Sequence, residues 1–461
     1  MSNYISSTIC ALATAPGIGA IAVIRLSGEE AISICNQVFK GANLLEVASH
    51  TIHFGTVRDD NNKIIDEVLV SVFKGKKSFT GENSVEISTH GSPYIQQKVI
   101  QLLLQHGAKS AGPGEFTLRA FLNGKLDLSQ AEAVADVIAA NSDTSHELAM
   151  SQMRGGFSNE IQKLREQLIH FASLIELELD FGEEDVEFAD RDDLKELVEK
   201  LQAALIILIK SFDYGNVIKS GVPVAIIGEP NVGKSTLLNT LLNEDKAIVS
   251  DIAGTTRDAI EDEMIINGIS FRFIDTAGIR ETTDTIETIG IEKTFEKIGE
   301  ASIVLLLVDA ASISKEQLIT DIASIEAKIA NQNKRLIIVA NKIDQAEATA
   351  KQKFEGLENV IFISAKEKNN VSAIEDKLFD YVNSGALQNN DVVVTNVRHF
   401  EALTRANESL SKVLEGLAIN ITGDFLAMDI RQALHFLGEI TGEITTDDLL
   451  DNIFSKFCIG K

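Results

Sequence analysis

The sequence predicts a multidomain chain, α/β plus all-α, in which a helical domain is interrupted by an inserted α/β domain. Three observations predict this architecture. The chain has 461 residues, which is too long for one ordinary domain. Its hydrophobic spacing changes from strands to helices, then to strands alternating with helices, and back to helices. A glycine-rich loop follows the first strand of the third region. We expect a mixed α/β domain at 1–122, helical halves at 123–215 and 385–461, and the insertion at 216–384.

The first region consists of short apolar segments broken by Gly, Pro and Asn. Strands are expected at Ala20–Leu26, Glu67–Phe73 and Ser84–His90, with turns at Asp60–Asn62 and Gly91–Pro93. A helix is expected from Tyr94 to His106, because apolar residues recur there at helical spacing. Strands mixed with a helix predict an α/β domain.

Helical spacing dominates from Ser129 onward and returns near the C-terminus. Ser129 and Glu132 have the spacing of a capping box, in which a hydroxyl and a carboxylate bond free N–H groups at a helix start. Helices are expected at Asn159–Asp180, Leu194–Ser211, Arg398–Leu417, Asp424–Thr441 and Thr446–Phe457. The stretch 182–193 holds seven carboxylates against one arginine, so we expect a solvated surface loop there.

The charge balance argues against a protein that binds nucleic acid through a broad basic surface. Lys and Arg number 42 and Asp and Glu number 68, so the formal charge is −26, whereas phosphate affinity is carried mainly by Lys and Arg. The three cysteines have no CxxC spacing and, being odd in number, predict no disulfide framework. With no signal-peptide pattern and no apolar run of about 20 residues, the sequence predicts a cytoplasmic protein that does not enter a membrane.

The insertion opens with a phosphate-binding motif. The apolar strand Val222–Ile227 is followed by a P-loop, Gly228-Glu-Pro-Asn-Val-Gly-Lys-Ser235, and by a helix at Thr236–Leu242. The glycines let backbone N–H groups turn toward phosphates, and the helix N-terminus favours anionic charge. Lys234 is expected to reach the β- and γ-phosphates, and the Ser235 hydroxyl is expected to bind Mg²⁺.

Two further motifs belong to the phosphate side of the same site. Asp275-Thr-Ala-Gly278 follows the strand Ile269–Ile274, so the Asp275 carboxylate is expected to hold the Mg²⁺ water shell and the Gly278 N–H to meet the γ-phosphate. The motif Gly254-Thr-Thr-Arg-Asp258 lies between the P-loop and Asp275 in sequence. It suits a switch segment whose Thr256 hydroxyl ligates Mg²⁺ only when the γ-phosphate is present.

Two motifs select the base. Asn341-Lys-Ile-Asp344 follows the strand Leu336–Ala340, and a carboxylate at Asp344 accepts both N–H groups on the Watson–Crick edge of guanine, which adenine does not offer. Ser364-Ala-Lys366 follows the strand Val360–Ile363, and the Ala365 N–H is expected to bond the base oxygen. Five motifs in this order predict guanine-nucleotide binding.

The motif set resembles that of the translation-factor class of GTPases, with one departure from Ras-like enzymes. Ile279 stands where those enzymes have a glutamine that orients the attacking water, and its side chain forms no hydrogen bond. Glu281 is the nearest carboxylate for that role, and Arg257 and Arg280 are candidates for charge stabilisation. The alternative for each is an ordinary exposed switch residue.

The segments outside the insertion carry further motifs. They are Ala13-Thr-Ala-Pro-Gly17, Ile24-Arg-Leu-Ser-Gly28, Thr80-Gly-Glu82, Gly112-Pro-Gly-Glu-Phe116, Arg119–Leu128 and the final Phe457-Cys-Ile-Gly-Lys461. With these motifs the chain resembles, from near its first residue to its last, the MnmE (TrmE) family of tRNA-modification GTPases, whose members end in a CxGK signature.

The resemblance implies a folate-binding-like N-terminal domain that holds a one-carbon tetrahydrofolate (5-formyl or 5,10-methylene) and forms a homodimer. It implies a helical domain with an inserted Ras-like P-loop G domain, and hydrolysis triggered when G domains pair in the presence of GTP and K⁺. An FAD-containing partner, MnmG (GidA), would form a hetero-oligomer with the chain and hold most of the tRNA. Together they would install an aminomethyl or carboxymethylaminomethyl group at C5 of the wobble uridine.

The resemblance also assigns residues. The K⁺ ligands would be Asn231, Ser250, Thr255 and, through its carbonyl, Ile252. Glu281 would orient the attacking water. The nucleotide contacts would be Asn231, Val232, Gly233, Lys234, Ser235, Thr236, Ser250, Asp251, Ile252, Ala253, Gly254, Thr255, Thr256, Asp275, Thr276, Ala277, Gly278, Asn341, Lys342, Asp344, Ser364 and Ala365. A monovalent cation beside the β–γ bridge would neutralise developing charge. Asn231 has the alternative of a turn residue.

Folate contacts implied by the resemblance fall on Arg25, Glu82, Lys125 and Lys461. Arginine and lysine suit the carboxylates of folate, and a carboxylate suits the N–H groups of the pterin. Taken alone, these four are isolated charges that any surface carries. Cys458 is assigned a role in the modification chemistry, with a buried small apolar residue as the alternative.

Two other functions share part of this set of motifs. A ribosome-assembly GTPase of the Era or EngA type shares the nucleotide motifs, but its RNA-binding domain would bring basic clusters that this acidic chain lacks. A folate-binding scaffold with a vestigial G domain conflicts with five intact nucleotide motifs. Stabilisation by a tetrahydrofolate would separate the main interpretation from both.

Overall fold

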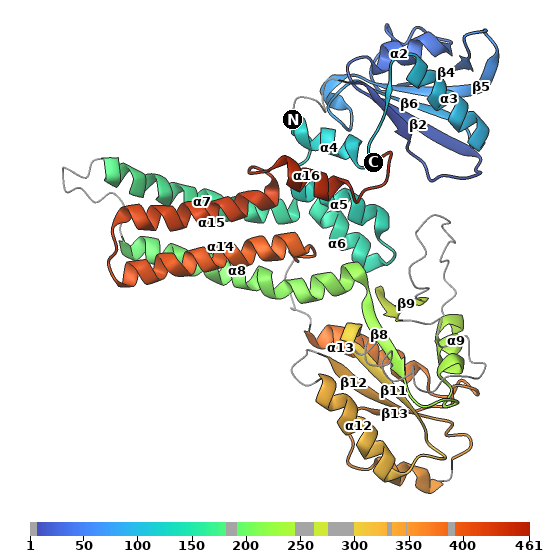
Figure 1. The fold of residues 1–461 in the computed structure, drawn as a ribbon, viewed down its shortest axis with the longest axis vertical. Helices are drawn as coiled ribbons and strands as arrows, with labels where there is room; N and C mark the ends of the chain where they lie inside the picture. Colours follow the sequence, from blue (N-terminus) through green and yellow to red (C-terminus); the bar gives the residue numbers. More distant parts are fainter. Residues whose placement is uncertain are drawn as a thin grey trace. The chain divides into compact units, whose positions relative to one another are not determined.

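The computed structural model describes residues 7–180, 191–244, 262–274, 299–329, 334–346, 348–385 and 392–461. The described chain forms two compact units. The first comprises Met1–Ala139, Ala149–Ile207 and Arg398–Lys461, and the second comprises Ala140–Leu148 and Leu208–Val397. The predicted fold class is confirmed, since an N-terminal mixed α/β part and a helical part surround an inserted α/β part in sequence (Figure 1).

The N-terminal part is built on a seven-stranded sheet with the order β3-β4-β5-β6-β2-β1-β7. All of its pairs are antiparallel except β1 with β7. The strands are β1 Ile9–Leu12, β2 Ile21–Ser27, β3 Phe39–Lys40, β4 Thr51–Arg58, β5 Ile64–Phe73, β6 Ser84–His90 and β7 Lys109–Ser110. Helices α2 Ala31–Val38 and α3 Pro93–Gln105 bury one face of this sheet. A short helix, α4 Glu115–Leu122, and a 3₁₀ turn, η1 Gly75–Lys77, complete the part.

The three predicted strands are confirmed, with small differences at their ends. β5 begins at Ile64, three residues before the predicted start, because its inward residues Asp66, Val68 and Val70 alternate from there. Helix α3 begins at Pro93 rather than Tyr94, since proline is well suited to the first helical position.

The helical part contains α5 Leu128–Ala139, α6 Asp143–Met153, α7 Gly156–Asp180, α8 Arg191–Ser220, α14 Val397–Ala418, α15 Gly423–Thr441 and α16 Asp447–Phe454. Helices α7 and α15 pack side by side although far apart in sequence (Figure 1). The predicted capping box is wrong by two residues. Asp127 Oδ1 accepts from the Gln130 N–H, and Gln130 Oε1 accepts from the Asp127 N–H. Ser129 lies inside the helix and pairs with Ser158, while Glu132 bonds α14.

Helix α8 continues to Ser220, so the predicted end before Tyr214 is wrong. Gly215 is not a helix stop but a packing residue, because a Cβ there would lie 2.2 Å from the Val394 carbonyl oxygen. In the described chain α8 is also the one helix long and apolar enough to cross a membrane by length and composition. One face of this helix, which includes Leu194, Val198 and Leu205, is buried in the protein.

The inserted part carries a six-stranded sheet with the order β13-β12-β11-β8-β10-β9, in which only β9 runs antiparallel to its neighbour. The strands are β8 Val222–Ile227, β9 Asp262–Ile266, β10 Ile269–Phe273, β11 Ile303–Asp309, β12 Arg335–Asn341 and β13 Val360–Phe362. Helices α9 Lys234–Glu244 and α13 Ser372–Gly385 bury one face. Helix α12 Lys315–Ile329 and the 3₁₀ segment η2 Ala348–Phe354 bury the other. Both faces are covered, so the parallel strands are almost wholly apolar.

Candidate functional site

The P-loop connects the C-terminal end of β8 to the start of α9, as predicted. Gly228 has φ +153°, and a Cβ there would lie 2.2 Å from the Leu307 carbonyl oxygen on β11. Gly233 has φ +103°, and a Cβ there would lie 2.4 Å from Asn341 Nδ2. Both positions therefore require glycine, one for contact with the sheet and one for contact with the base-selecting motif.

The Lys234 side chain folds back across the loop. Its Nζ donates to the carbonyl oxygens of Gly228 and Glu229, each at 2.8 Å. The ammonium is thus held over the backbone that the motif turns toward phosphate. Ser235 lies in the first turn of α9, and Asn231 has the left-handed φ of +63°. That φ fits the turn role considered for Asn231, and the K⁺ role remains a prediction.

Asn341 joins the phosphate side of the site to the base side. It is 3% exposed, its Nδ2 donates to the Val232 carbonyl oxygen at 2.8 Å, and its Oδ1 accepts from the Ala365 N–H at 2.9 Å. Thr240 Oγ1 of α9 donates to the Ala365 carbonyl oxygen at 3.1 Å. Three predicted motifs are therefore brought together. The Ala365 N–H is already used by Asn341, so the predicted contact with the base oxygen would share or replace that bond.

Lys342 pairs with an acidic residue that the sequence interpretation missed. Lys342 has a φ of +63°, and its Nζ donates to Asp309 Oδ2 at 2.8 Å. Burial would raise the pKa of Asp309, but hydrogen bonds from Lys342 and from the Ala311 N–H lower it below its ordinary value. The signal was present, because Asp309 ends the apolar strand β11 on the sheet edge where the other motifs begin.

The Asp344 carboxylate is oriented by its neighbour in the next motif. Ser364 Oγ donates to Asp344 Oδ1 at 2.6 Å, and this hydrogen bond is the main cause of a lowered pKa for Asp344. Ser364 Oγ also accepts from the Glu367 N–H. The carboxylate therefore stays ionised near neutral pH, as an acceptor for two N–H groups must.

Part of the predicted nucleotide site lies outside the described residues. This holds for the whole switch segment, for the Asp-Thr-Ala-Gly motif and for the residues that follow it. The predicted residues concerned are Ser250, Asp251, Ile252, Ala253, Gly254, Thr255, Thr256, Arg257, Asp275, Thr276, Ala277, Gly278, Ile279, Arg280 and Glu281. Within the described residues, no cluster of three or more His, Cys, Asp or Glu side chains could hold a metal.

The predicted folate residues converge at one place in the N-terminal part. The Arg25 guanidinium lies 5.6 Å from the ring centres of both Phe79 and Phe116, and its Nε donates to Glu86 at 2.9 Å. Glu82 accepts from Ser27 Oγ at 2.9 Å and from Arg119 at 3.3 Å.

The other two predicted folate residues reach the same segments. Lys125 packs its stem beside Gly81 and donates to the Lys76 carbonyl oxygen. The Lys461 carbonyl oxygen accepts from the Phe116 N–H at 3.1 Å, which brings the C-terminus against α4. Sequence-distant residues thus lie around the segment 79–82 and the start of α4.

Arg119, which belongs to the motif Arg119–Leu128 and has no role assigned from the sequence, lies at the same place. Its side chain is wholly buried, it pairs with Glu115 at 2.8 Å and with Glu82, and its Nε has no hydrogen-bond partner among the described residues. A buried guanidinium with an unused N–H beside a carboxylate fits a polar ligand.

The final motif is docked by backbone contacts. The Gly114 N–H donates to the Cys458 carbonyl oxygen, and Pro113 forms an isolated bridge with Ile459. Gly460 has φ +100°, and a Cβ there would lie 2.1 Å from the Leu12 carbonyl oxygen. The Cys458 side chain is exposed, so the alternative of a buried apolar residue is wrong.

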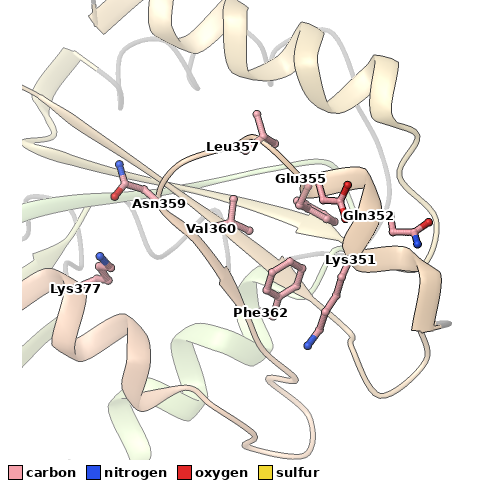
Figure 2. A pocket seen from close by; sticks show the side chains of 9 residues that line it. Lys351, Gln352, Glu355, Leu357, Asn359, Val360, Phe362 and Lys377 are labelled. Carbon is pink, nitrogen blue, oxygen red and sulfur yellow. The ribbon is translucent and has the colours of Figure 1, made fainter.

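An open cavity of about 440 Å³ lies elsewhere, at the edge strand β13. Figure 2 shows side chains from η2, from the segment that leads to β13, from β13 itself and, at Lys377, from α13 around it. Phe354 and Phe362 meet edge to face at 5.2 Å, and Lys351 Nζ lies 5.4 Å from the Phe362 ring centre. None of the predicted nucleotide or folate residues lines this cavity.

Comparison with known proteins covers almost the whole chain. Residues 8–125 match the profile of the GTP-binding protein TrmE N-terminus, and residues 128–458 match that of the MnmE helical domain. A tRNA modification GTPase MnmE of Christiangramia forsetii is 58% identical over 99% of this chain and 100% of that protein. One of Flavobacterium psychrophilum is 56% identical over 98% and 99%. The chain belongs to the MnmE family of tRNA modification GTPases. This membership excludes the ribosome-assembly class and the scaffold with a vestigial G domain.

Membership of the MnmE family accounts for both groups of motifs. The N-terminal profile covers Arg25, Glu82 and Lys125, and the helical profile brackets the inserted G domain and ends at Cys458. Among solved structures, the FeoB G-domain from Methanococcus jannaschii is 22% identical over 35% of this chain and 98% of that chain, with a TM-score of 0.24. A score this low adds nothing to the topology described above.

Proposed function

We propose that this chain of the MnmE family binds and hydrolyses GTP and uses the hydrolysis cycle in tRNA modification. The observation that carries the proposal is the bridge made by Asn341 between Val232 in the P-loop and Ala365 in the base-selecting loop. A buried amide held by both loops sets the distance between the phosphate and guanine subsites. The ionised Asp344 carboxylate supplies the acceptor that distinguishes guanine from adenine.

Magnesium would be held by the Ser235 hydroxyl, with Thr256 and Asp275 as the proposed further contributors. A hydroxyl in the first turn of α9 fits Mg²⁺, which prefers oxygen ligands. When bound, the ion supplies charge neutralisation on the β- and γ-phosphates. The chain's own part is to present Lys234 and the backbone N–H groups of the loop, from Asn231 to Thr236, to the same phosphates.

For hydrolysis we assign the orientation of the attacking water to Glu281, because Ile279 has no hydrogen-bonding group. Potassium would be held by Asn231, Ser250, Thr255 and the Ile252 carbonyl oxygen, and would complete the site when two G domains pair.

GTP turnover in K⁺ is expected to exceed turnover in Na⁺ at equal ionic strength. Glu281→Ala is expected to lower the maximal rate with little change in nucleotide affinity. Equal low rates in both salts would remove the cation mechanism.

Homodimerisation through the N-terminal part is supported by an exposed apolar face of its sheet. Phe54 on β4 is 66% exposed and lies directly opposite Leu69 on β5, which is 47% exposed. Ile52 adds to the same face. Exposed apolar side chains gathered on one face favour a protein partner. Substituting Phe54 by Glu is expected to shift the sedimentation of the chain toward the monomer, and an unchanged dimer would place the interface elsewhere.

A one-carbon tetrahydrofolate would bind where Arg25, Glu82, Lys125 and Lys461 converge. The buried Arg119 beside Glu82 makes the place polar enough for a pterin. When bound, 5-formyl- or 5,10-methylene-tetrahydrofolate supplies the carbon unit.

With the FAD-containing partner MnmG in a hetero-oligomer, the carbon would reach C5 of the wobble uridine as an aminomethyl or carboxymethylaminomethyl group. The partner would hold most of the tRNA, since this chain carries a formal charge of −26. We place the reaction in the cytoplasm and assign Cys458 a part in its chemistry.

Two experiments test the proposal. The Asp344→Asn variant should lose affinity for GTP and gain affinity for xanthosine triphosphate, because the amide N–H donates to the extra carbonyl oxygen of xanthine. Retained preference for GTP would place base selection elsewhere. Mass spectrometry of wobble uridines in tRNA from cells lacking this protein should show loss of the C5 substituent. Unchanged uridines would leave the GTPase function standing and remove the tRNA pathway.

A further inference from the structure

The ammonium group of Lys342 is already bound in the structure, although Lys342 belongs to the base-selecting motif. Lys342 directly follows Asn341, which joins the two loops of the site, and it precedes Asp344 by two residues. Its Nζ donates to Asp309 Oδ2 at 2.8 Å. The Lys342 and Asp309 side chains are 28% and 18% exposed, so water screens this ion pair less than it screens a surface pair.

The Asp309 carboxylate is held by the turn that follows β11. Its Oδ1 accepts from the Ala311 N–H at 3.0 Å, while its Oδ2 accepts from the lysine. The Ala310 N–H donates to the Asn341 carbonyl oxygen at 2.9 Å, and Asp309 is the register partner of Asn341 on the parallel strand β12. The carboxylate is therefore fixed beside the first residue of the base-selecting motif.

The backbone of Lys342 is fixed as well. Its φ of +63° lies in the left-handed region, which residues other than glycine adopt rarely. The neighbouring Ile343 N–H donates to the Ile363 carbonyl oxygen at 3.2 Å, and the Gln345 N–H donates to the Lys342 carbonyl oxygen at 3.0 Å. The four-carbon stem of Lys342 thus spans two fixed points, its own backbone and the Asp309 carboxylate.

A lysine stem that is held at both ends offers an apolar surface. Lysine stems cover apolar groups while the ammonium keeps its polar partners. A purine has apolar faces and a polar edge, and Asp344 is the proposed partner of the edge. The stem of Lys342 therefore suits the face. Because the stem is ordered before a ligand arrives, less conformational freedom is lost on binding.

From these contacts we infer that Asp309 is a positioning residue for the purine: it holds the Lys342 ammonium so that the lysine stem is ready for the face of the base. The inference rests on the proposed GTP function. Support of the turn after β11 does not require the ion pair, because that turn keeps its bonds from Ala311 to Asp309 and from Ala310 to Asn341 without the lysine.

Calorimetric titration of the full-length Asp309→Asn variant with GDP and Mg²⁺ tests this inference. Asparagine keeps an oxygen for the Ala311 N–H but lacks the charge that binds the ammonium. Affinity for GDP should fall about 3- to 10-fold, as expected when one flexible side chain has to be ordered on binding. The KM for GTP should rise with an unchanged kcat, because the stem contacts the base equally before and during hydrolysis.

Variants of Lys342 separate its ammonium from its stem. Lys342→Met keeps an unbranched stem without the charge, so it should lose the same factor in GDP affinity as Asp309→Asn. Adding Asp309→Asn to Lys342→Met should cause no further loss, because the two residues form one contact. Lys342→Ala also removes the stem and should lose more.

A second nucleotide separates the face of the base from its edge. Inosine diphosphate lacks the exocyclic amino group of guanine, so its affinity reports on the edge contact with Asp344. Asp309→Asn should lower the affinities for GDP and for inosine diphosphate by the same factor, and their ratio should remain that of the wild type.

Asp321→Asn on α12 is the matched control. It removes the same charge from the same unit, at an exposed carboxylate that accepts from Gln317 Nε2 at 2.8 Å. GDP affinity and the KM for GTP should not change in this variant. Thermal unfolding without nucleotide shows whether each variant is folded.

The inference is overturned if Asp309→Asn binds GDP like the wild type, if its loss adds fully to that of Lys342→Met, or if the ratio of the two affinities changes. Should Asp309→Asn fail to fold, Lys342→Met decides, and wild-type GDP affinity in that variant overturns the inference. Failure of the proposed function looks different, because the wild type would then bind neither nucleotide.

Discussion

Single residues at the nucleotide site act through neighbours that lie far away in sequence. Asn341 follows β12, yet its two hydrogen bonds join Val232 in the P-loop to Ala365 after β13. Gly233 must lack a side chain because Asn341 occupies the space where a Cβ would stand. The spacing within each motif predicted the chemistry of these residues. Their mutual contacts come from the parallel sheet, which places the ends of β8, β12 and β13 at one edge.

Asn341→Ala tests this bridge. The substitution leaves the Val232 carbonyl and the Ala365 N–H buried without a partner, which we expect to cost about 2 to 4 kcal/mol of stability. Guanine-nucleotide affinity should fall as well, since the two subsites lose their common support. Thermal unfolding and calorimetric titration measure both effects. Asn216→Ala, which removes an exposed asparagine from α8, should change neither; equal effects of the two variants would contradict the bridge.

The three cysteines differ by burial. Burial raises the pKa of Cys10 to about 11 and that of Cys35 to about 12, whereas Cys458 is exposed. A thiol needs to ionise to react, so an alkylating agent added at about pH 8 should modify Cys458 alone in the native protein. Peptide mass spectrometry identifies the modified residue, and urea should expose all three thiols. Rapid native labelling of Cys35 would show that the N-terminal core opens.

At the scale of elements, helix ends are joined by buried polar groups that the sequence pattern assigned to another role. Glu132, expected in a capping box, accepts from Arg398 Nε and Nη2 and is bonded to His399 Nε2 at 2.8 Å. Arg398 also donates to the carbonyl oxygens of Glu439 and Ile440 at the end of α15. Phe157 of α7 stacks on His399 at 5.0 Å. One cluster therefore joins α5, α7, α14 and α15.

The Glu132 cluster predicts a pH dependence. Burial would raise the pKa of Glu132, but His399 and Arg398 lower it from 4.5 to about 2. Because the folded pKa lies below the ordinary value, the stabilisation is complete above pH 4.5 and is lost as the pH falls toward 2. Glu132→Gln should destabilise the protein by about 3 kcal/mol at neutral pH. Urea unfolding measures the free energy of unfolding, and the difference in this free energy between the wild type and Glu132→Gln should become smaller below pH 4.5.

A matched exposed pair provides the control for this prediction. Glu176→Gln breaks the contact with Arg431, in which both side chains are well exposed, and should change stability by less than about 1 kcal/mol. A difference between wild type and Glu132→Gln that stays constant from neutral pH to below pH 4 would show that the cluster acts through packing and not through charge.

Gly215 shows how packing changes the meaning of a glycine inside a helix. Replacing a helical glycine by alanine ordinarily stabilises a helix by about 1 kcal/mol. In α8, the new Cβ would lie 2.2 Å from the Val394 carbonyl oxygen, so Gly215→Ala should destabilise the protein by about 1 to 3 kcal/mol. Gly299→Ala, at a helical position with open space, is the control for thermal unfolding. Stabilisation by Gly215→Ala would contradict the contact.

At the scale of the whole molecule, residues 458–461 pack against the N-terminal part, where the proposed folate site lies. Backbone bonds join Cys458 to Gly114 and Lys461 to Phe116, beside Arg25 and the buried Arg119. Gly460 fits under Leu12 only without a side chain. A chain with a long insertion thus returns to close its N-terminal domain, and the proposed folate site depends on both ends.

Gly460→Ala tests the closure of this site. The new Cβ would lie 2.1 Å from the Leu12 carbonyl oxygen at a φ of +100°, so the C-terminal motif should detach. The stabilisation of the protein by added 5-formyl-tetrahydrofolate should then fall, as measured by thermal shift. Gly75 also has a positive φ, but a Cβ there would face open space. Gly75→Ala should therefore keep the stabilisation by 5-formyl-tetrahydrofolate. An unchanged response in Gly460→Ala would place folate away from the C-terminus.

The sequence by itself determined the strand–loop–helix of the P-loop, the order of the five nucleotide motifs and most helices, because these depend on spacing along the chain. Tertiary structure alone decided that Gly215 continues a helix and that Asp127, not Ser129, caps α5. It also decided that Arg119 lies beside the predicted folate residue Glu82 and that Asp309 pairs with Lys342 of the nucleotide motifs. These outcomes depend on which groups are buried together, and burial is a property of the folded chain that local spacing does not encode.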